Sequence, residues 1–118
     1  MCTLLLVDDS PTQSCYLEFV LSSLGHEVHT QDSANLQPEE LKPMAFDIAL
    51  VSLLLANSNG FEIGLRLQNL GFERVAIVTM SPRSTDVQWT KALGLLGVLD
   101  APNSLVNIRH QLQKMLQC

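Results

Sequence analysis

Short apolar runs alternate along this chain with segments in which apolar residues recur every three or four positions. In the first run, Leu4–Val7, every residue is apolar, which is typical of a strand buried on both faces of a parallel sheet. Ser10 and Pro11 then suit the N-cap and first turn of a helix. Apolar residues repeat at helical spacing over 16–24, and Gly25 favours a stop. The opening therefore predicts a strand, a polar loop and a helix.

The same alternation recurs four more times. Further strands are expected at 26–31, 46–51, 75–78 and 97–100, and further helices at 36–42, 61–70, 85–93 and 104–116. The strand at 26–31 is the least hydrophobic, so we expect it near an edge of the sheet. Five strands alternating with five helices predict a parallel sheet covered on both faces. No linker or repeat interrupts the pattern, so a single domain is expected over residues 1–118.

Composition and charge narrow the function classes. The 118 residues are 47% hydrophobic and 16% charged, which indicates a folded domain rather than a disordered chain. A net charge of -5 argues against nucleic acid or an anionic membrane as a direct partner. The three cysteines, at positions 2, 15 and 118, form neither an even set nor a metal-ligand spacing, which favours thiols in a reducing cytosol. With no signal peptide and no stretch of roughly 20 apolar residues, we expect a cytoplasmic protein.

Polar and small residues follow four of the expected strands. Asp8 and Asp9 come after the first strand, Ser52 after the third, Thr79 after the fourth and Ala101 after the fifth. In an open parallel sheet, functional residues gather beyond the carboxyl ends of the strands. We therefore expect these residues to lie close together.

Five segments carry these residues or lie beside them: Leu5–Pro11, Phe46–Ser52, Gly60–Glu62, Ala76–Thr79 and Gly94–Pro102. In order and spacing they resemble the receiver domains of two-component response regulators, the CheY-like superfamily, over the whole chain. The resemblance implies a flavodoxin-like (βα)5 doubly wound α/β domain. Its five-stranded parallel sheet would have the order 2-1-3-4-5, with helices on both faces. The alternative is a flavodoxin-like domain unrelated to signalling, since that architecture hosts many functions.

Several positions keep the residues that the resemblance implies. Asp8 and Asp9 match the acidic pair with which receivers bind a divalent cation. Thr79 matches the signalling hydroxyl at the end of the fourth strand. Pro102 is retained and is expected to follow a cis peptide bond, as in the family.

Three other positions depart from the family. Ser52 stands where the phosphoacceptor aspartate belongs, Ala101 where a lysine belongs, and Val98 where receivers usually carry a switch aromatic. The acceptor, its charge partner and the readout are thus all changed.

The change at Ser52 alters the chemistry of the site. A neutral hydroxyl is a weak nucleophile without an adjacent general base, and no histidine or lysine is expected beside it. Asp47 cannot substitute, because five residues of extended chain place it about 16 Å away. The formal charge of the site is nevertheless preserved. The intact site of a receiver has three carboxylates and one lysine, which sum to -2, and here Asp8 and Asp9 alone also sum to -2. The loss of both the acceptor aspartate, at Ser52, and the lysine, at Ala101, predicts a site that no longer transfers phosphate.

Two roles stay open for the acidic pair. One or two carboxylates with waters can bind Mg²⁺ weakly, so Asp8 and Asp9 are weak candidates for a metal site. The favoured alternative is structural, with Asp8 helping to cap the first helix and Asp9 solvated. For Thr79 we likewise favour a structural role. No cofactor is required on either interpretation.

These residues favour a non-enzymatic pseudo-receiver, a regulatory protein-interaction module. It is expected to be the amino-terminal domain of a larger regulator or a small stand-alone adaptor. The alternatives are a residually phosphorylatable receiver and a receiver that binds a small ligand or cation at the altered pocket. The expected partners are an output domain, a sensor kinase or a second copy of the chain.

The resemblance also implies where such partners bind. In the family, the face built from the fourth helix, fifth strand and fifth helix mediates dimerisation and output contacts. Apolar residues supplied to this region are Trp89, Leu93, Leu105, Ile108 and Leu112. Most are expected in the core, whereas Trp89 is the interface candidate because tryptophan is enriched at binding hot spots.

Overall fold

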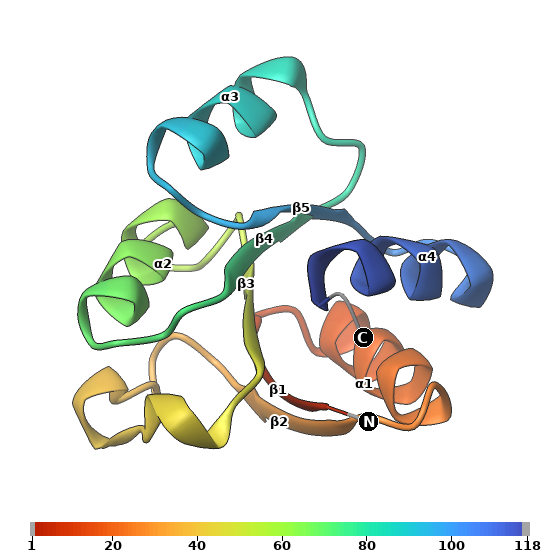
Figure 1. The fold of residues 1–118 in the computed structure, drawn as a ribbon, viewed down its shortest axis with the longest axis horizontal. Coiled ribbons are helices and arrows are strands. Elements are labelled where there is room, and N and C mark those ends of the chain that lie inside the picture. Colours follow the sequence, from red (N-terminus) through yellow and green to blue (C-terminus); the bar gives the residue numbers. More distant parts are fainter. Residues whose placement is uncertain (1, 117–118) are drawn as a thin grey trace.

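The structure is a computed structural model that describes residues 2–116. Its strands are β1 (Thr3–Val7), β2 (Glu27–Gln31), β3 (Ile48–Ser52), β4 (Val75–Thr79) and β5 (Gly97–Asp100). Its α-helices are α1 (Pro11–Ser23), α2 (Gly60–Asn69), α3 (Ser84–Ala92) and α4 (Leu105–Leu116). The strands form one parallel sheet in the order β2-β1-β3-β4-β5 (Figure 1). The predicted fold class and strand order are confirmed.

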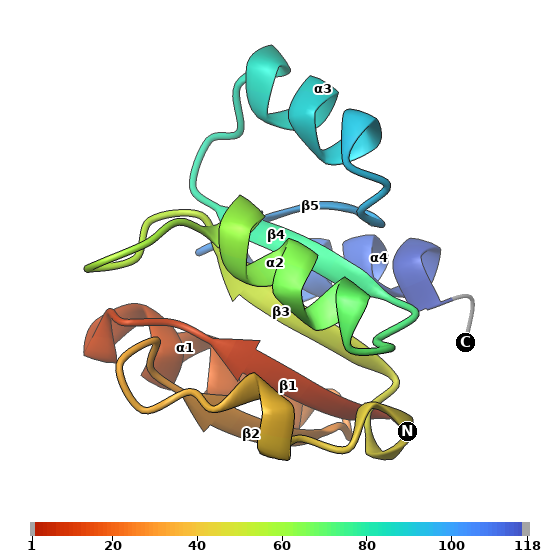
Figure 2. The same cartoon turned by 90° about the vertical axis from the view of Figure 1, so that its left-hand side faces the viewer.

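The sheet separates α1 and α4 on one face from α2 on the other (Figures 1 and 2). An apolar layer lies on each face. In β1, Leu4 and Leu6 pack with α1 and α4, whereas Leu5 and Val7 pack with α2 on the opposite face. All four side chains are fully buried, because successive residues of a strand point to opposite faces. The apolar run at the start of the chain therefore supplies both layers of the core.

The helix expected at 36–42 does not form. The connection instead contains two 3₁₀ turns, η1 (Pro38–Glu40) and η2 (Pro43–Ala45). Gln37 and Lys42 each precede a proline and have non-helical backbone, with ψ of 84° and 102°. A proline disfavours the helical conformation of the residue before it, and the two prolines leave room for only one short turn between them. The prediction of a helix at 36–42 is therefore wrong.

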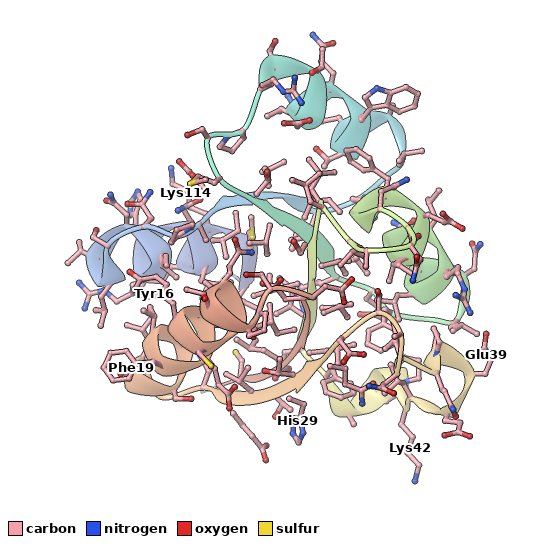
Figure 3. All side chains as sticks on the ribbon, turned by 180° about the vertical axis from the view of Figure 1, so that it is seen from behind. Tyr16, Phe19, His29, Glu39, Lys42 and Lys114 are labelled. Carbon is pink, nitrogen blue, oxygen red and sulfur yellow. The ribbon has the colours of Figure 1, made fainter. Side chains whose placement is uncertain are left out.

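Two side-chain contacts join the helices to neighbouring turns and loops. Arg66 on α2 forms an ion pair with Glu39 of η1 at 3.0 Å, which ties this turn to α2. On the other face, the Tyr16 hydroxyl of α1 donates a hydrogen bond to the carbonyl of Asn103, just before α4 (Figure 3). β2 lies at a sheet edge with no fully buried residue, as its weak hydrophobicity predicts.

The structure places two of the three cysteines. Cys15 is an exposed free thiol on α1 and Cys2 is buried, while Cys118 lies outside the described residues. Across residues 2–116, no helix is long and apolar enough to cross a lipid bilayer.

Candidate functional site

The carboxyl ends of β1, β3 and β4 surround a pocket of about 240 Å³, which we call the strand-end pocket. Its lining residues are Asp8, Ser10, Gln13, Ser52, Leu54, Val78, Thr79 and Met80. The pairing of neighbouring strands brings their carboxyl ends together. Ser52 of β3 pairs with Val78 of β4, and Thr79 of β4 pairs with Asp100 of β5. The expectation that Asp8, Ser52 and Thr79 gather at one edge of the sheet is confirmed.

Asp8 is buried at the base of this pocket, with 4% of its surface exposed. Its Oδ1 accepts a hydrogen bond from the Ser10 backbone N–H and its Oδ2 one from Gln13 Nε2, both at 2.9 Å. Burial raises the pKa of the Asp8 carboxyl, against the lowering effect of these two hydrogen bonds, and nearby Asp9 raises it further. Asp8 therefore holds its charge in an unfavourable environment at the start of α1.

Asp9 has a different role from the one expected. Its carboxylate accepts hydrogen bonds from the Ser33 N–H at 2.6 Å, the Ser33 hydroxyl at 2.7 Å and the Ala56 N–H at 2.7 Å. Partial burial raises the pKa of Asp9, but these hydrogen bonds outweigh it and lower the pKa overall. The prediction of a solvated Asp9 is wrong, because the side chain joins the loops that follow β2 and β3.

The acidic pair does not fit a dedicated metal site. All four carboxylate oxygens of Asp8 and Asp9 already accept hydrogen bonds from protein donors, and the two side chains contact different loops. Within residues 2–116, no group of three His, Cys, Asp or Glu side chains is placed to hold an ion. Mg²⁺ requires near-octahedral oxygen ligands, and two carboxylates that contact different loops, with no third acidic side chain of residues 2–116 beside them, supply few of these.

Ser52 lies at the end of β3 and is 6% exposed. Its hydroxyl donates to the Leu54 carbonyl over a long distance of 3.4 Å. No lysine, arginine or histidine is among the residues that line the strand-end pocket, so its lining offers no cationic side chain to offset the charge of a phosphoryl group. Asp47 lies at the other end of β3 from Ser52. Its Oδ2 accepts a hydrogen bond there from the Thr3 N–H at 2.7 Å.

The remaining positions of the predicted site lie around β5. Ala101 is fully buried and packs in the apolar layer of α1 and α4, outside the lining of the pocket. The peptide bond between Ala101 and Pro102 is cis, as the resemblance implied. Val98 is partly buried in β5, and Thr79 is partly exposed in the pocket wall.

Comparison with known proteins places this arrangement in a family. No protein-family model matches the chain. The protein PilH of Pseudomonas aeruginosa is 32% identical over 109 residues, which cover 86% of this chain and 87% of PilH. The chain belongs to the CheY-like family of response-regulator receiver domains.

Solved structures agree with this assignment. Vibrio cholerae chemotaxis protein CheY4 matches with a TM-score of 0.84 at 24% identity, covering 98% of this chain and 99% of CheY4. The signal receiver domain of a modulated diguanylate cyclase from Desulfovibrio desulfuricans matches with a TM-score of 0.76 at 25% identity, covering 99% of this chain and 94% of that domain. The fold of this receiver domain is thus that of response regulators in two-component signalling.

Three residues of the strand-end pocket lie outside the segments from which the site is predicted. Gln13 stands three positions after the N-cap Ser10, the spacing of a capping box, so the sequence contained a signal for a helix-start contact. Leu54 and Met80 follow β3 and β4 in loops, where they are 81% and 65% exposed. Their position in the sequence, just beyond the ends of two strands, could have indicated this role, because side chains there form the rim of the pocket.

Proposed function

We propose that this receiver domain acts in the cytoplasm as a phosphorylation-independent interaction module of a two-component system, without enzymatic activity of its own. The observation that carries this proposal is Ser52 at the end of β3, in a pocket that no cationic side chain lines. Phosphoryl transfer depends on positioned charge, and both the anionic nucleophile and its cationic partner are missing here.

The proposal requires no cofactor. Asp8 and Asp9 contact different loops, and no third acidic side chain of the described residues is placed beside them, so we expect any Mg²⁺ binding to be weak. A titration with MgCl₂ that follows the backbone amides of both residues by NMR measures this directly. Saturation at submillimolar Mg²⁺ would contradict the expectation.

Ser52→Asp alone is not expected to restore the receiver's response to a phosphoryl mimic. The added carboxylate would lie beside buried Asp8 with no lysine to offset it, because Ala101 occupies that position. The test is a beryllofluoride and Mg²⁺ titration of the wild type and Ser52→Asp, followed by NMR. We expect no slow-exchange second state at Thr79 in either protein, and such a state in Ser52→Asp would show that the pocket is less altered than we propose.

The proposed partner surface is the face of α3, β5 and α4, which corresponds to the fourth helix, fifth strand and fifth helix of the family. Trp89 on α3 is 58% exposed, and its ring centroid lies 6.5 Å from that of Phe61. Ile108 and Leu112 are buried in the core, as expected, while Leu105 is 38% exposed. An exposed tryptophan beside a second aromatic ring supports a binding role because such side chains supply large contact areas.

Trp89→Ala is expected to change the free energy of unfolding by no more than about 0.5 kcal/mol, because the side chain is mostly exposed. Ile108→Ala, on the other side of the same region, is expected to cost about 2–5 kcal/mol because its side chain is fully buried. Urea denaturation of both variants measures the difference. A loss of more than about 2 kcal/mol in Trp89→Ala would mean that Trp89 is a core residue and not an interface residue.

A further inference from the structure

The strand-end pocket combines one buried carboxylate with an apolar rim. Asp8 is the only carboxylate in its lining, and none of the lining residues carries a positive charge. Leu54 and Met80, at the mouth, are among the most exposed large apolar side chains of the described chain. A buried carboxylate without an ion partner is costly, and a ligand that brings a positive charge would offset that cost.

The pocket also has unused hydrogen-bond acceptors. A carboxylate offers about four lone-pair sites, and Asp8 uses two of them, for Ser10 and Gln13. The Ser52 hydroxyl donates a hydrogen bond to the Leu54 carbonyl, and its own lone pairs remain available. No hydrogen bond from the described residues reaches the Thr79 hydroxyl. Three residues that line one small space therefore carry acceptors of different strength.

We propose that the strand-end pocket binds a primary alkylammonium group. Its three N–H donors match the acceptors of Asp8, Ser52 and Thr79, and its charge partners Asp8. A guanidinium carries five donors in a planar fork and would leave some unpaired here. A bare divalent ion would gain nothing from the apolar rim.

The size and rim of the pocket fit the alkyl portion of such a ligand. A volume of about 240 Å³ leaves room for a short aliphatic amine. The alkyl stem would pack between Leu54 and Met80, covering two side chains that are otherwise exposed. Both a free amine and the lysine side chain of a partner present this chemistry.

The inference rests on the proposed function, since a phosphoryl group on Ser52 would fill the same space. The two claims fail in different experiments. Phosphorylation of Ser52 would overturn the proposed function, whereas an absence of amine binding in an unphosphorylated protein overturns only this inference.

The test titrates the whole chain with n-butylammonium chloride at constant ionic strength and follows the backbone amides by NMR. We expect saturable shifts at Ser52, Thr79 and Met80, and affinity at least about tenfold weaker for n-butanol, which has the same chain without the charge. Nα-acetyl-lysine methylamide forms a second arm. Tighter binding of this derivative identifies a protein lysine as the source of the group, and equal or weaker binding identifies a free amine.

Two variants locate the binding. Asp8→Asn should weaken n-butylammonium binding at least about tenfold, equivalent to about 1.4 kcal/mol. Asp32→Asn is the matched control, because Asp32 is exposed, accepts its hydrogen bonds from Asn35 and lies outside this pocket. Its affinity should match the wild type. Equal binding of n-butanol, equal losses in both variants, or no saturable shift with n-butylammonium would each overturn the proposal.

Discussion

Gly60→Ala is expected to lower the free energy of unfolding by about 1–3 kcal/mol, the range typical of overpacking a well-filled site. A Cβ at Gly60 would lie 2.5 Å from the Ser52 carbonyl oxygen and 2.9 Å from Leu53 Cα. Both neighbours are backbone atoms that cannot rotate away. The Gly60 N–H also donates to the Leu53 carbonyl at 2.9 Å, so moving the chain apart would strain this hydrogen bond.

Gly64→Ala on the same helix is the matched control. Its Cβ would meet the side chains of Val75 and Leu95 at 3.4 and 3.5 Å, which can adjust. Alanine is favoured over glycine inside a helix by roughly 0.5–1 kcal/mol, so this variant should be neutral or slightly more stable. Urea denaturation compares the two proteins. Equal stabilities would contradict the close approach of α2 to the end of β3.

Asp9→Asn and Asp8→Asn are expected to change stability in opposite directions. Asp9→Asn should cost about 1–3 kcal/mol, because an amide cannot accept all three hydrogen bonds from Ser33 and Ala56 and leaves a donor facing a donor. Asp8→Asn should raise the free energy of unfolding, because it removes a buried charge while its oxygen still accepts from Ser10. Chemical denaturation at neutral pH measures both.

The pH dependence follows from the two pKa shifts. The pKa of Asp9 is lowered below its ordinary 3.8, so its stabilising effect is present above pH 3.8 and is lost as the pH falls through the folded-state pKa. The pKa of Asp8 is raised above 3.8, so its destabilising effect is present above the folded-state pKa and is relieved as the pH falls towards 3.8.

Repeating the denaturation from about pH 6 to about pH 3 should therefore separate the variants. The advantage of Asp8→Asn over the wild type should disappear first, since its window lies above pH 3.8. The deficit of Asp9→Asn should persist to lower pH. Stability changes of the same sign in both variants at neutral pH would refute the assignment of these two environments.

The strands could be predicted from the sequence because each is a short apolar run between polar or helical segments. The residues of β1 and β3 are almost all apolar, and such runs have few stable places other than the middle of a covered parallel sheet. The connection after β2 could not be predicted in the same way. Pro38 and Pro43 lie so close together that their restraint on the preceding residues leaves no room for the helix expected at 36–42.

The sequence predicts several of the residues that line the candidate site, but not the hydrogen bonds that they form. That Asp8, Ser52 and Thr79 meet follows from strand ends at one edge of a parallel sheet. The bonds of Asp9 to Ser33 and Ala56 join segments 24 and 47 residues away, and no local pattern marks such partners. Whether Ala101 would line the pocket also depended on packing, and the structure places it in the apolar layer instead.

Incubation of the wild-type protein with acetyl phosphate and Mg²⁺, followed by intact-mass spectrometry, tests the central claim most directly. Ser52→Ala serves as the control, because it removes the hydroxyl and changes little else at the end of β3. We expect both proteins to keep their unmodified mass. A Mg²⁺-dependent gain of one phosphoryl group in the wild type that Ser52→Ala lacks would contradict it.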